Sequence, residues 1–125
     1  MTSIERTAYP RFKKPFTENE LKQIFQPTEQ EFAFVKKQAR KSYYSLTLMS
    51  LLKCQQYLGY SPAIENIPLQ IQNYLRDQLG LMSLVELLED KETTKNTFKL
   101  YRQAIRNFLN IIAILSKIKY SVLLI

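Results

Sequence analysis

The chain has 125 residues, the size of one domain, or of one domain and the start of another. It contains no histidine, one cysteine and two glycines, which excludes a Cys/His zinc site, a histidine-dependent nucleophile and a glycine-rich phosphate loop. Its 18 Lys and Arg against 11 Asp and Glu give a net charge of +7, which favours nucleic acid first and an anionic membrane surface second; the alternative is a basic, soluble, helical protein without an anionic partner. We therefore expect no metal, no cofactor and no catalytic residue.

Residues 1–16 are predicted to form a basic arm. Pro10 and Pro15 prevent a helix through this segment, and three cations lie between the two prolines. These cations are Arg11, Lys13 and Lys14. A basic arm of this kind can enter a DNA minor groove, and the alternative interpretation is a disordered tail without a ligand.

Residues 17–90 show the pattern of a small helical bundle. Thr17 with Glu20, and Thr28 with Glu31, match the capping box, so we expect helices over about 17–25 and 28–40. The second helix ends in a basic cluster of Lys36, Lys37, Arg40 and Lys41. This cluster predicts a DNA contact, and the alternative is that the cations only favour the helix C-terminus.

The third predicted helix forms the centre of the bundle. We expect Ser45 to cap it and Gly59 to end it, with leucines on a broad apolar face. Ser50, Lys53 and Gln56 fall on the opposite side, and Lys53 is counted among the DNA-binding candidates. Cys54 lies in an apolar run without a partner cysteine, which predicts a buried thiol.

Two shorter helices are predicted to complete the bundle. One begins near Pro68 and ends at Leu79 before Gly80, and another spans 83–89 with Ser83 as its cap. Four tyrosines surround the third helix: Tyr43, Tyr44, Tyr57 and Tyr60. They could stack on bases, but ordinary packing with the ring buried is the favoured interpretation.

A long helix is predicted to follow a polar hinge at residues 89–94. Four cations recur at i, i+4, i+7 and i+11 and form the basic stripe: Lys95, Lys99, Arg102 and Arg106. No acidic residue follows Glu92, so the stripe predicts contacts to a phosphate backbone rather than an ordinary solvated face. Gln103 and Asn107 lie beside it and are our candidates for reading base edges.

The predicted fold is all-α, a small bundle followed by a long basic amphipathic helix. Residues 17–90 form the N-terminal DNA-binding domain, and residues 91–110 begin a second helical DNA-binding segment. The amphipathic pattern breaks after about Ser116, because Lys119 falls on the apolar face. Residues 111–125 are expected to form a hydrophobic tail, too short and too interrupted by lysines to span a membrane.

Several segments of the chain carry a resemblance to a known family. They are ERTAYPRF at 5–12, PTEQE at 27–31, LLKCQQYLGY at 51–60 and YRQAIR at 101–106. In order and spacing they resemble the N-terminal region of the large replicative transposases of class II bacterial transposons, the Tn-three type. The resemblance covers residues 4 to about 110, and after Leu109 the chain departs from the family pattern.

The resemblance implies a DNA-binding fragment of a transposase. Such a fragment would recognise the terminal inverted repeats of a transposable element during DNA transposition, a form of DNA recombination, in a bacterial cytoplasm at the nucleoid. It would have no catalytic activity of its own, since the family's catalytic domain lies far beyond this region. The departure after Leu109 suggests a truncated reading frame with a tail foreign to the family. Two alternatives remain: a module that pairs with full-length transposase or with itself, and an inert remnant.

Overall fold

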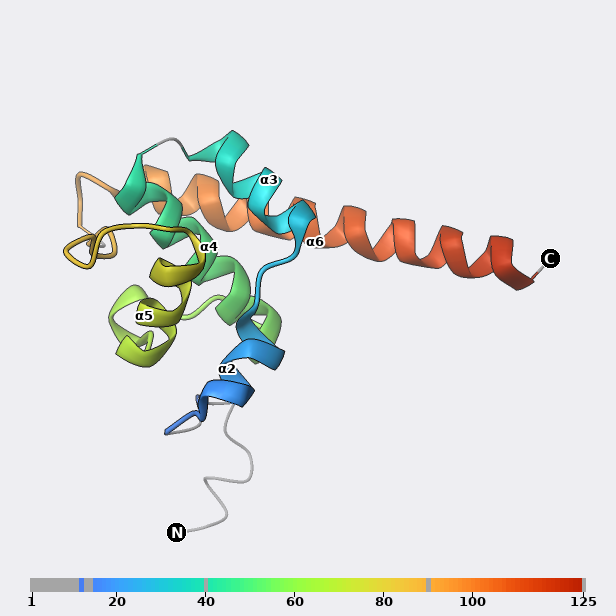
Figure 1. The fold of residues 1–125 in the computed structure, drawn as a ribbon. Coiled ribbons are helices and arrows are strands. Elements are labelled where there is room, and N and C mark those ends of the chain that lie inside the picture. The colour runs from blue at the N-terminus through green and yellow to red at the C-terminus, as the bar shows by residue number, and fades with distance from the viewer. Residues whose placement is uncertain (1–11, 13–14, 40, 90, 125) are drawn as a thin grey trace, which may run out of the picture. The chain divides into compact units, whose positions relative to one another are not determined.

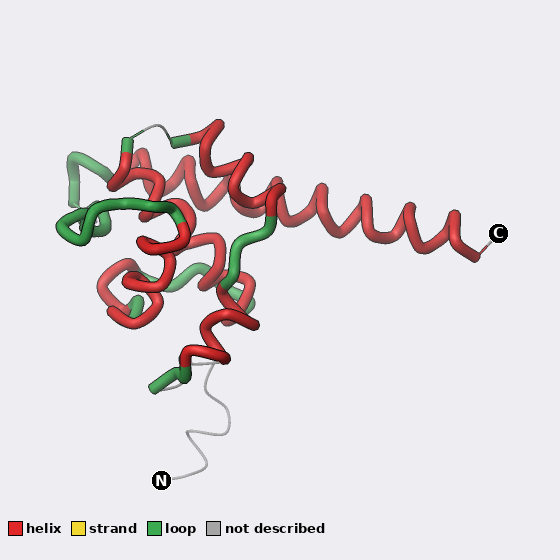
Figure 2. The backbone as a smooth tube through the Cα atoms, viewed as in Figure 1, coloured by secondary structure: helices red, strands yellow, loops and turns green. Residues whose placement is uncertain are grey.

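The computed structural model describes residues 12, 15–39, 41–89 and 91–124. Within these ranges the chain contains only helices and loops, and no strand (Figure 2). The all-α prediction is therefore confirmed. The chain divides into two compact units, residues 1–89 and residues 90–125, and each is described by itself.

The described residues of the first unit form four α-helices, with α4, Ser42–Leu58, at the centre of a bundle (Figure 1). Helices α2, Glu18–Phe25, α3, Glu29–Gln38, and α5, Leu69–Gln78, all contact α4, and α2 also contacts α5. Every residue from 46 to 54 in α4 is buried. The expected polar side of this helix is therefore wrong for Ser50 and Lys53, which are buried, whereas Gln56 is exposed as expected.

Both predicted capping boxes are present. The Thr17 hydroxyl accepts from the Glu20 amide at 3.1 Å, and the Glu20 carboxylate accepts from the Thr17 amide at 2.9 Å. Thr28 and Glu31 repeat the arrangement at the start of α3. Each box satisfies two amides that would otherwise lack a helical partner, which explains why both helices begin where the sequence indicated.

The start of α4 differs from the prediction, whereas its end agrees. The helix begins at Ser42, and its N-cap Lys41 makes no side-chain cap. Ser45 does not cap the helix, because its hydroxyl donates to the Ala39 carbonyl at 3.0 Å and closes the turn from α3. Gly59 ends α4 at φ 85°, a left-handed conformation that glycine adopts without a side-chain clash.

The last residues of the predicted arm are part of the bundle. Phe16 is buried, and its ring meets Phe25 edge-on with centroids 5.4 Å apart. The ring of Tyr57 stacks on Phe12 at 6.0 Å and meets Phe16 at 5.8 Å. Tyr57 therefore follows the packing interpretation of the tyrosines. The arm cations Arg11, Lys13 and Lys14 lie outside the described residues.

Beyond α4, a short 3-10 helix at Ile64–Asn66 leads to α5. Helix α5 follows Pro68 and is capped at Leu79 before Gly80, as predicted. The predicted helix at 83–89 is absent: Ser83 and Leu84 lie in a turn, followed by a segment without helix.

Bonds to the bundle hold this segment in its non-helical form. The Arg76 Nε donates to the Val85 carbonyl at 2.7 Å, and the Leu88 amide donates to the Thr47 hydroxyl at 2.8 Å. These partners occupy the backbone groups that a helix would need for its own hydrogen bonds.

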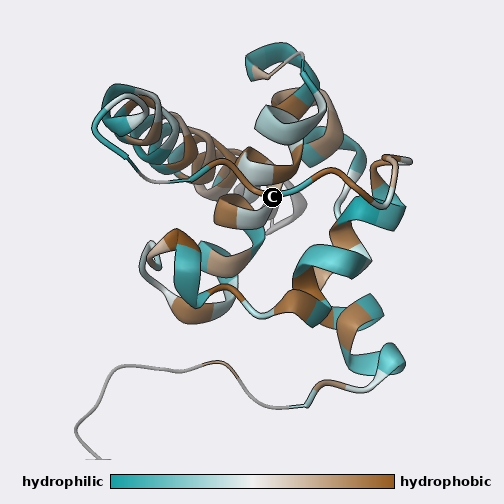
Figure 3. Ribbon diagram, turned by 90° about the vertical axis from the view of Figure 1, so that its left-hand side faces the viewer, coloured by the Kyte–Doolittle hydropathy of each residue, from teal (hydrophilic) through white to brown (hydrophobic). Residues whose placement is uncertain are grey.

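The second unit consists of one long helix, α6, at Lys95–Leu124. It begins directly after Thr94, as the sequence predicted, where the Thr94 hydroxyl accepts from the Lys91 amide at 2.8 Å. The helix continues beyond Ser116, where its amphipathic pattern breaks, as far as Leu124. Hydrophobic and hydrophilic residues both occur along the helices (Figure 3). Among the described residues, no helix combines the length and apolar content needed to cross a bilayer.

Candidate nucleic-acid interface

The basic stripe lies along the first half of α6. Lys95, Lys99 and Arg106 are exposed, and Arg102 is half-buried. From the first to the last of these cations the helix rises by about 16 Å, roughly five nucleotide steps along one DNA strand. Gln103 is exposed beside the stripe, and so is Asn107. The helix therefore presents a row of cations next to two amide side chains.

The four cations of the stripe differ in their surroundings. The Arg102 guanidinium lies over the Phe98 ring, 5.5 Å from its centroid, so part of its role is packing. The Lys95 ammonium is 3.9 Å from a Glu92 carboxylate oxygen, and both side chains are largely exposed. An exposed pair of this kind holds its lysine only weakly. Lys99 and Arg106 are thus the members best suited to test phosphate binding.

A second group of cations gathers where α3 turns into α4. Lys36 and Lys37 occupy the last turn of α3, and Lys41 precedes α4. All three are exposed, and Tyr43 is also exposed on the next turn. We call Lys36, Lys37 and Lys41 the basic corner. Arg40, which was predicted to join them, lies outside the described residues.

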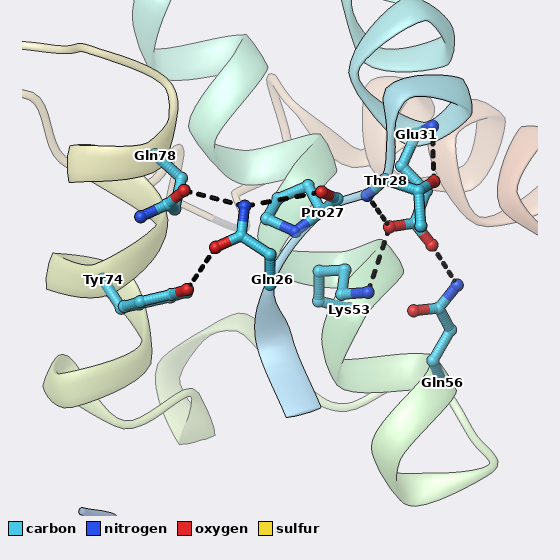
Figure 4. A network of polar contacts seen from close by, with 8 residues as sticks. All are labelled: Gln26, Pro27, Thr28, Glu31, Lys53, Gln56, Tyr74 and Gln78. Atoms are coloured by element: carbon cyan, nitrogen blue, oxygen red, sulfur yellow. Dashed lines mark hydrogen bonds and ion pairs between the residues drawn. The ribbon is translucent and has the colours of Figure 1, made fainter. Parts of the chain in front are cut away.

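Lys53 cannot serve as a surface contact to DNA. Its ammonium donates to the Glu31 carboxylate at 3.0 Å, and the two side chains are only 6% and 7% exposed (Figure 4). The helical pattern of α4 placed Lys53 on a polar side, but α3 covers that side with Glu31. We therefore remove Lys53 from the DNA-binding candidates.

Glu31 is the hub of this buried network. The Gln56 amide donates to its Oε2 at 2.6 Å, and the Thr28 backbone amide donates to its Oε1 at 2.8 Å. Burial alone would raise the pKa of Glu31, but the bonds from Gln56, Thr28 and Lys53 together hold the pKa below its usual value. The carboxylate is therefore ionised and joins α3 to α4.

A polar groove that no sequence pattern indicated lies between α2 and α5. The cavity measures about 580 Å³, and its polar lining includes Gln70, Asn73 and Asp77. At one side Tyr74 donates to the Gln26 side-chain oxygen, and the Gln26 amide donates to Gln78 at 2.8 Å (Figure 4). Burial raises the pKa of Tyr74, so its hydroxyl remains a donor at neutral pH.

The groove suits a neutral polar group better than a phosphate. Its charged lining residues are Glu18, Lys22 and Asp77, so acids outnumber cations. The only sign of the groove in the sequence was the high content of amide side chains in α5. These amides follow no periodic pattern.

Metal and thiol chemistry find no support in the described part of the chain. There, no three His, Cys, Asp or Glu side chains gather closely enough to hold a metal ion. Cys54 is buried as predicted, and desolvation raises the pKa of its thiol to about 12. The thiol is therefore protonated and unreactive at neutral pH.

One known protein family matches most of the chain. The family model for a domain of unknown function, DUF4158, matches residues 1–117. The chain belongs to this family. The DUF4158 match includes the basic corner and the basic stripe, and it extends past residue 110, where the sequence analysis expected the departure from a family pattern. No curated protein and no solved structure matches the chain.

Proposed function

We propose that this DUF4158 chain binds double-stranded DNA at the terminal inverted repeats of a transposon, as the N-terminal part of a Tn-three-type transposase. In this proposal it has no catalytic activity of its own and acts at the nucleoid in the bacterial cytoplasm. Two features support it: the resemblance of residues 4 to about 110 to such transposases, and the exposed cations on both units of the chain.

The basic stripe is the observation that carries the proposal. From Lys95 to Leu124, α6 contains no Asp or Glu, whereas exposed faces of helices usually mix both signs of charge. An uninterrupted row of cations attracts phosphates and gains free energy from the counterions that DNA releases. Lys99 and Arg106 provide the most accessible of these charges.

Base recognition is assigned to the two amides beside the stripe. The side chain of Gln103 or Asn107 can donate and accept at once, which matches the N6 and N7 atoms of adenine in the major groove. Phosphate contacts from the neighbouring cations would fix the helix in register, so that these amides meet particular base pairs.

The basic corner supplies a second set of phosphate contacts in this proposal. Lys36, Lys37 and Lys41 come together there because the turn between α3 and α4 is short and is closed by the Ser45 hydroxyl. Its partner group on the DNA in this proposal is the phosphate backbone, which lysines bind as point charges. On the basis of the sequence alone, Arg11, Lys13, Lys14 and Arg40 are further candidates for phosphate contacts.

Fluorescence anisotropy tests the proposal directly. Binding to a duplex with the terminal repeat of the neighbouring transposon is compared with binding to a scrambled duplex at several salt concentrations. We expect the repeat to be bound at least about 100-fold more tightly, with an affinity that falls as salt rises. Equal binding to both duplexes would leave a basic surface without sequence recognition, and absence of binding to either would refute the proposal.

A further inference from the structure

Another cavity of the first unit lies beside the basic corner. It measures about 270 Å³, and we call it the corner pocket. Helix α3 contributes Phe32 and Lys36 to its lining, α4 contributes Ser45, and the end of α5 with the residues that follow contributes Gln78, Leu79 and Leu81. The corner pocket is thus formed by three segments of the bundle rather than by one exposed helix face.

The charge of the corner pocket favours an anionic ligand. Among the described residues that line it, Lys36 alone carries a charge, and this lysine is exposed at the rim. The groove between α2 and α5 has the opposite balance, with Glu18 and Asp77 against Lys22. The corner pocket therefore suits a ligand with an apolar body and a negative charge at its edge.

The walls of the corner pocket match a flat heteroaromatic ring. The half-buried ring of Phe32 offers a surface for stacking, and Leu79 is apolar. The Gln78 Oε1 accepts from Gln26, whereas its Nε2 has no hydrogen-bond partner among the described residues (Figure 4). The Ser45 hydroxyl donates to a carbonyl of the turn, and its oxygen can still accept. One donor and one acceptor beside an aromatic wall are the contacts that a nucleobase uses.

The size of the corner pocket limits the ligand to a small group. Sites for drug-sized molecules and cofactors usually measure about 300–1,000 Å³, so 270 Å³ suits a single ring system better than a whole cofactor. Outside the pocket the positive charge continues over Lys37 and Lys41. A small organic anion would need only one of these cations, whereas a nucleic-acid strand has successive phosphates for all three.

A base in a paired duplex lies inside the stack and cannot enter a pocket, so the nucleotide must be unpaired. We propose that the corner pocket takes one unpaired base of a DNA strand, stacked on Phe32, while the basic corner holds the phosphates of that strand. The inference rests on the proposed function in one respect, the phosphate contacts of the basic corner, and it adds a base to them.

Fluorescence anisotropy with two strands of about 12 nucleotides tests the corner pocket. One strand is oligothymidylate, and the other is an abasic strand of equal length that keeps the phosphates and lacks the bases. We expect the wild type to bind oligothymidylate at least about 10-fold more tightly. Phe32→Leu keeps an apolar side chain but removes the stacking ring, so this preference should fall by at least about 5-fold. Equal binding of both strands by the wild type would overturn the proposal.

A matched control uses Phe34, which is also a half-buried phenylalanine of α3 but does not line the corner pocket. Phe34→Leu should change the preference by less than about 2-fold. Gln78→Glu is a second test, because it keeps the oxygen that accepts from Gln26 and loses the Nε2 donor, and it should also lower the preference. Circular dichroism checks that each variant is folded. A full preference in folded Phe32→Leu, or in Gln78→Glu if Phe32→Leu does not fold, would contradict the assignment.

The fully paired repeat duplex separates this inference from the proposed function. A wild type that binds the repeat selectively but shows no preference for oligothymidylate would refute the corner pocket alone, and the reverse result would refute repeat recognition alone. A repeat duplex with one bulged thymine then identifies the source of the base. Tighter binding than to the paired duplex indicates a base displaced from a duplex, whereas a preference seen only with the free strands indicates single-stranded DNA.

Discussion

Glu31 illustrates how one residue can serve two purposes. Its carboxylate completes the capping box of α3 and also binds Lys53 and Gln56 of α4. The first purpose is visible in the sequence, because a capping box is a local pattern. The second depends on how α3 and α4 pack, and it turns a cap into the polar joint between two helices.

Removal of the lysine from this joint should destabilise the fold. Lys53→Met leaves a buried carboxylate without its ion-pair partner, and we expect a loss of about 3 kcal/mol in the free energy of unfolding. Urea denaturation at pH 7 measures this loss. Adding Glu31→Gln to Lys53→Met should recover part of the loss, since a neutral amide needs no counter-charge; strictly additive losses would contradict a coupled pair.

The same carboxylate predicts a dependence of stability on pH. The pKa of Glu31 is held below its ordinary value of 4.5, so its ionised form stabilises the fold above that pH. This contribution is lost as the pH falls through the lowered pKa. The free energy of unfolding of the wild type should therefore decline more steeply below pH 4.5 than that of Glu31→Gln, as measured by urea denaturation at several pH values.

At the scale of elements, the ends of the helices decide the path of the chain. Thr17 and Thr28 start two helices, and Gly59 stops the longest helix of the bundle with a left-handed turn. A Cβ at Gly59 would meet no atom within 4 Å, so only the backbone conformation requires glycine there.

Gly59→Ala isolates this backbone cost. We expect a loss of about 1 kcal/mol in the free energy of unfolding, because alanine is strained at positive φ. Gly59→Asn should lose less, because asparagine tolerates the left-handed region better than alanine. Thermal or urea unfolding of the three proteins measures both values, and an alanine variant as stable as the wild type would show that this turn adapts without strain.

Local patterns predicted most helix limits, whereas packing decided the failures. Capping boxes and glycine stops act within a few residues, and these predictions were confirmed at Thr17, Thr28 and Gly59. The predicted helix at 83–89 was wrong because two side chains of the bundle bind its backbone: Arg76 binds the Val85 carbonyl, 9 residues away, and Thr47 binds the Leu88 amide, 41 residues away. For the same reason periodicity alone could not show that a neighbouring helix covers Lys53.

In the candidate site, too, local features could be predicted from the sequence and features that depend on packing could not. The basic stripe could be predicted because i, i+4 and i+7 positions of a helix share a face whatever else surrounds it. The groove between α2 and α5 could not be predicted, because it combines side chains from two helices about fifty residues apart in the sequence. A local sequence pattern does not show which distant helices pack together.

For the whole molecule, the separation of charge matters more than the total of +7. Acids are absent between Glu31 and Glu65 and again after Glu92, so cations there are not neutralised by nearby carboxylates in the sequence. The basic corner and the basic stripe fall in these two acid-free stretches. The proposed DNA contacts are thus concentrated in two segments rather than spread over the surface.

The salt dependence of DNA binding should report on these segments. Lys99→Ala with Arg106→Ala removes two exposed cations of the stripe, and the slope of log affinity against log salt should fall by about 1.8. The control is Lys22→Ala, which follows Glu18 and Glu20 on α2 and should leave the slope nearly unchanged. An unaltered slope in the double variant would remove the stripe from the DNA interface.

The attachment of Phe16 to α5 has a consequence for how the bundle opens. The Phe16 amide donates to the Gln70 side chain at 2.8 Å, and the Gln70 amide donates back to the Phe16 carbonyl, across 54 positions of sequence. A helical amide proton can exchange with solvent when a single turn frays, whereas the Phe16 proton is held by a side chain of α5 and is released when the entry to α2 separates from α5. The hydrogen-exchange rate of the Phe16 amide therefore reports how often this part of the bundle opens.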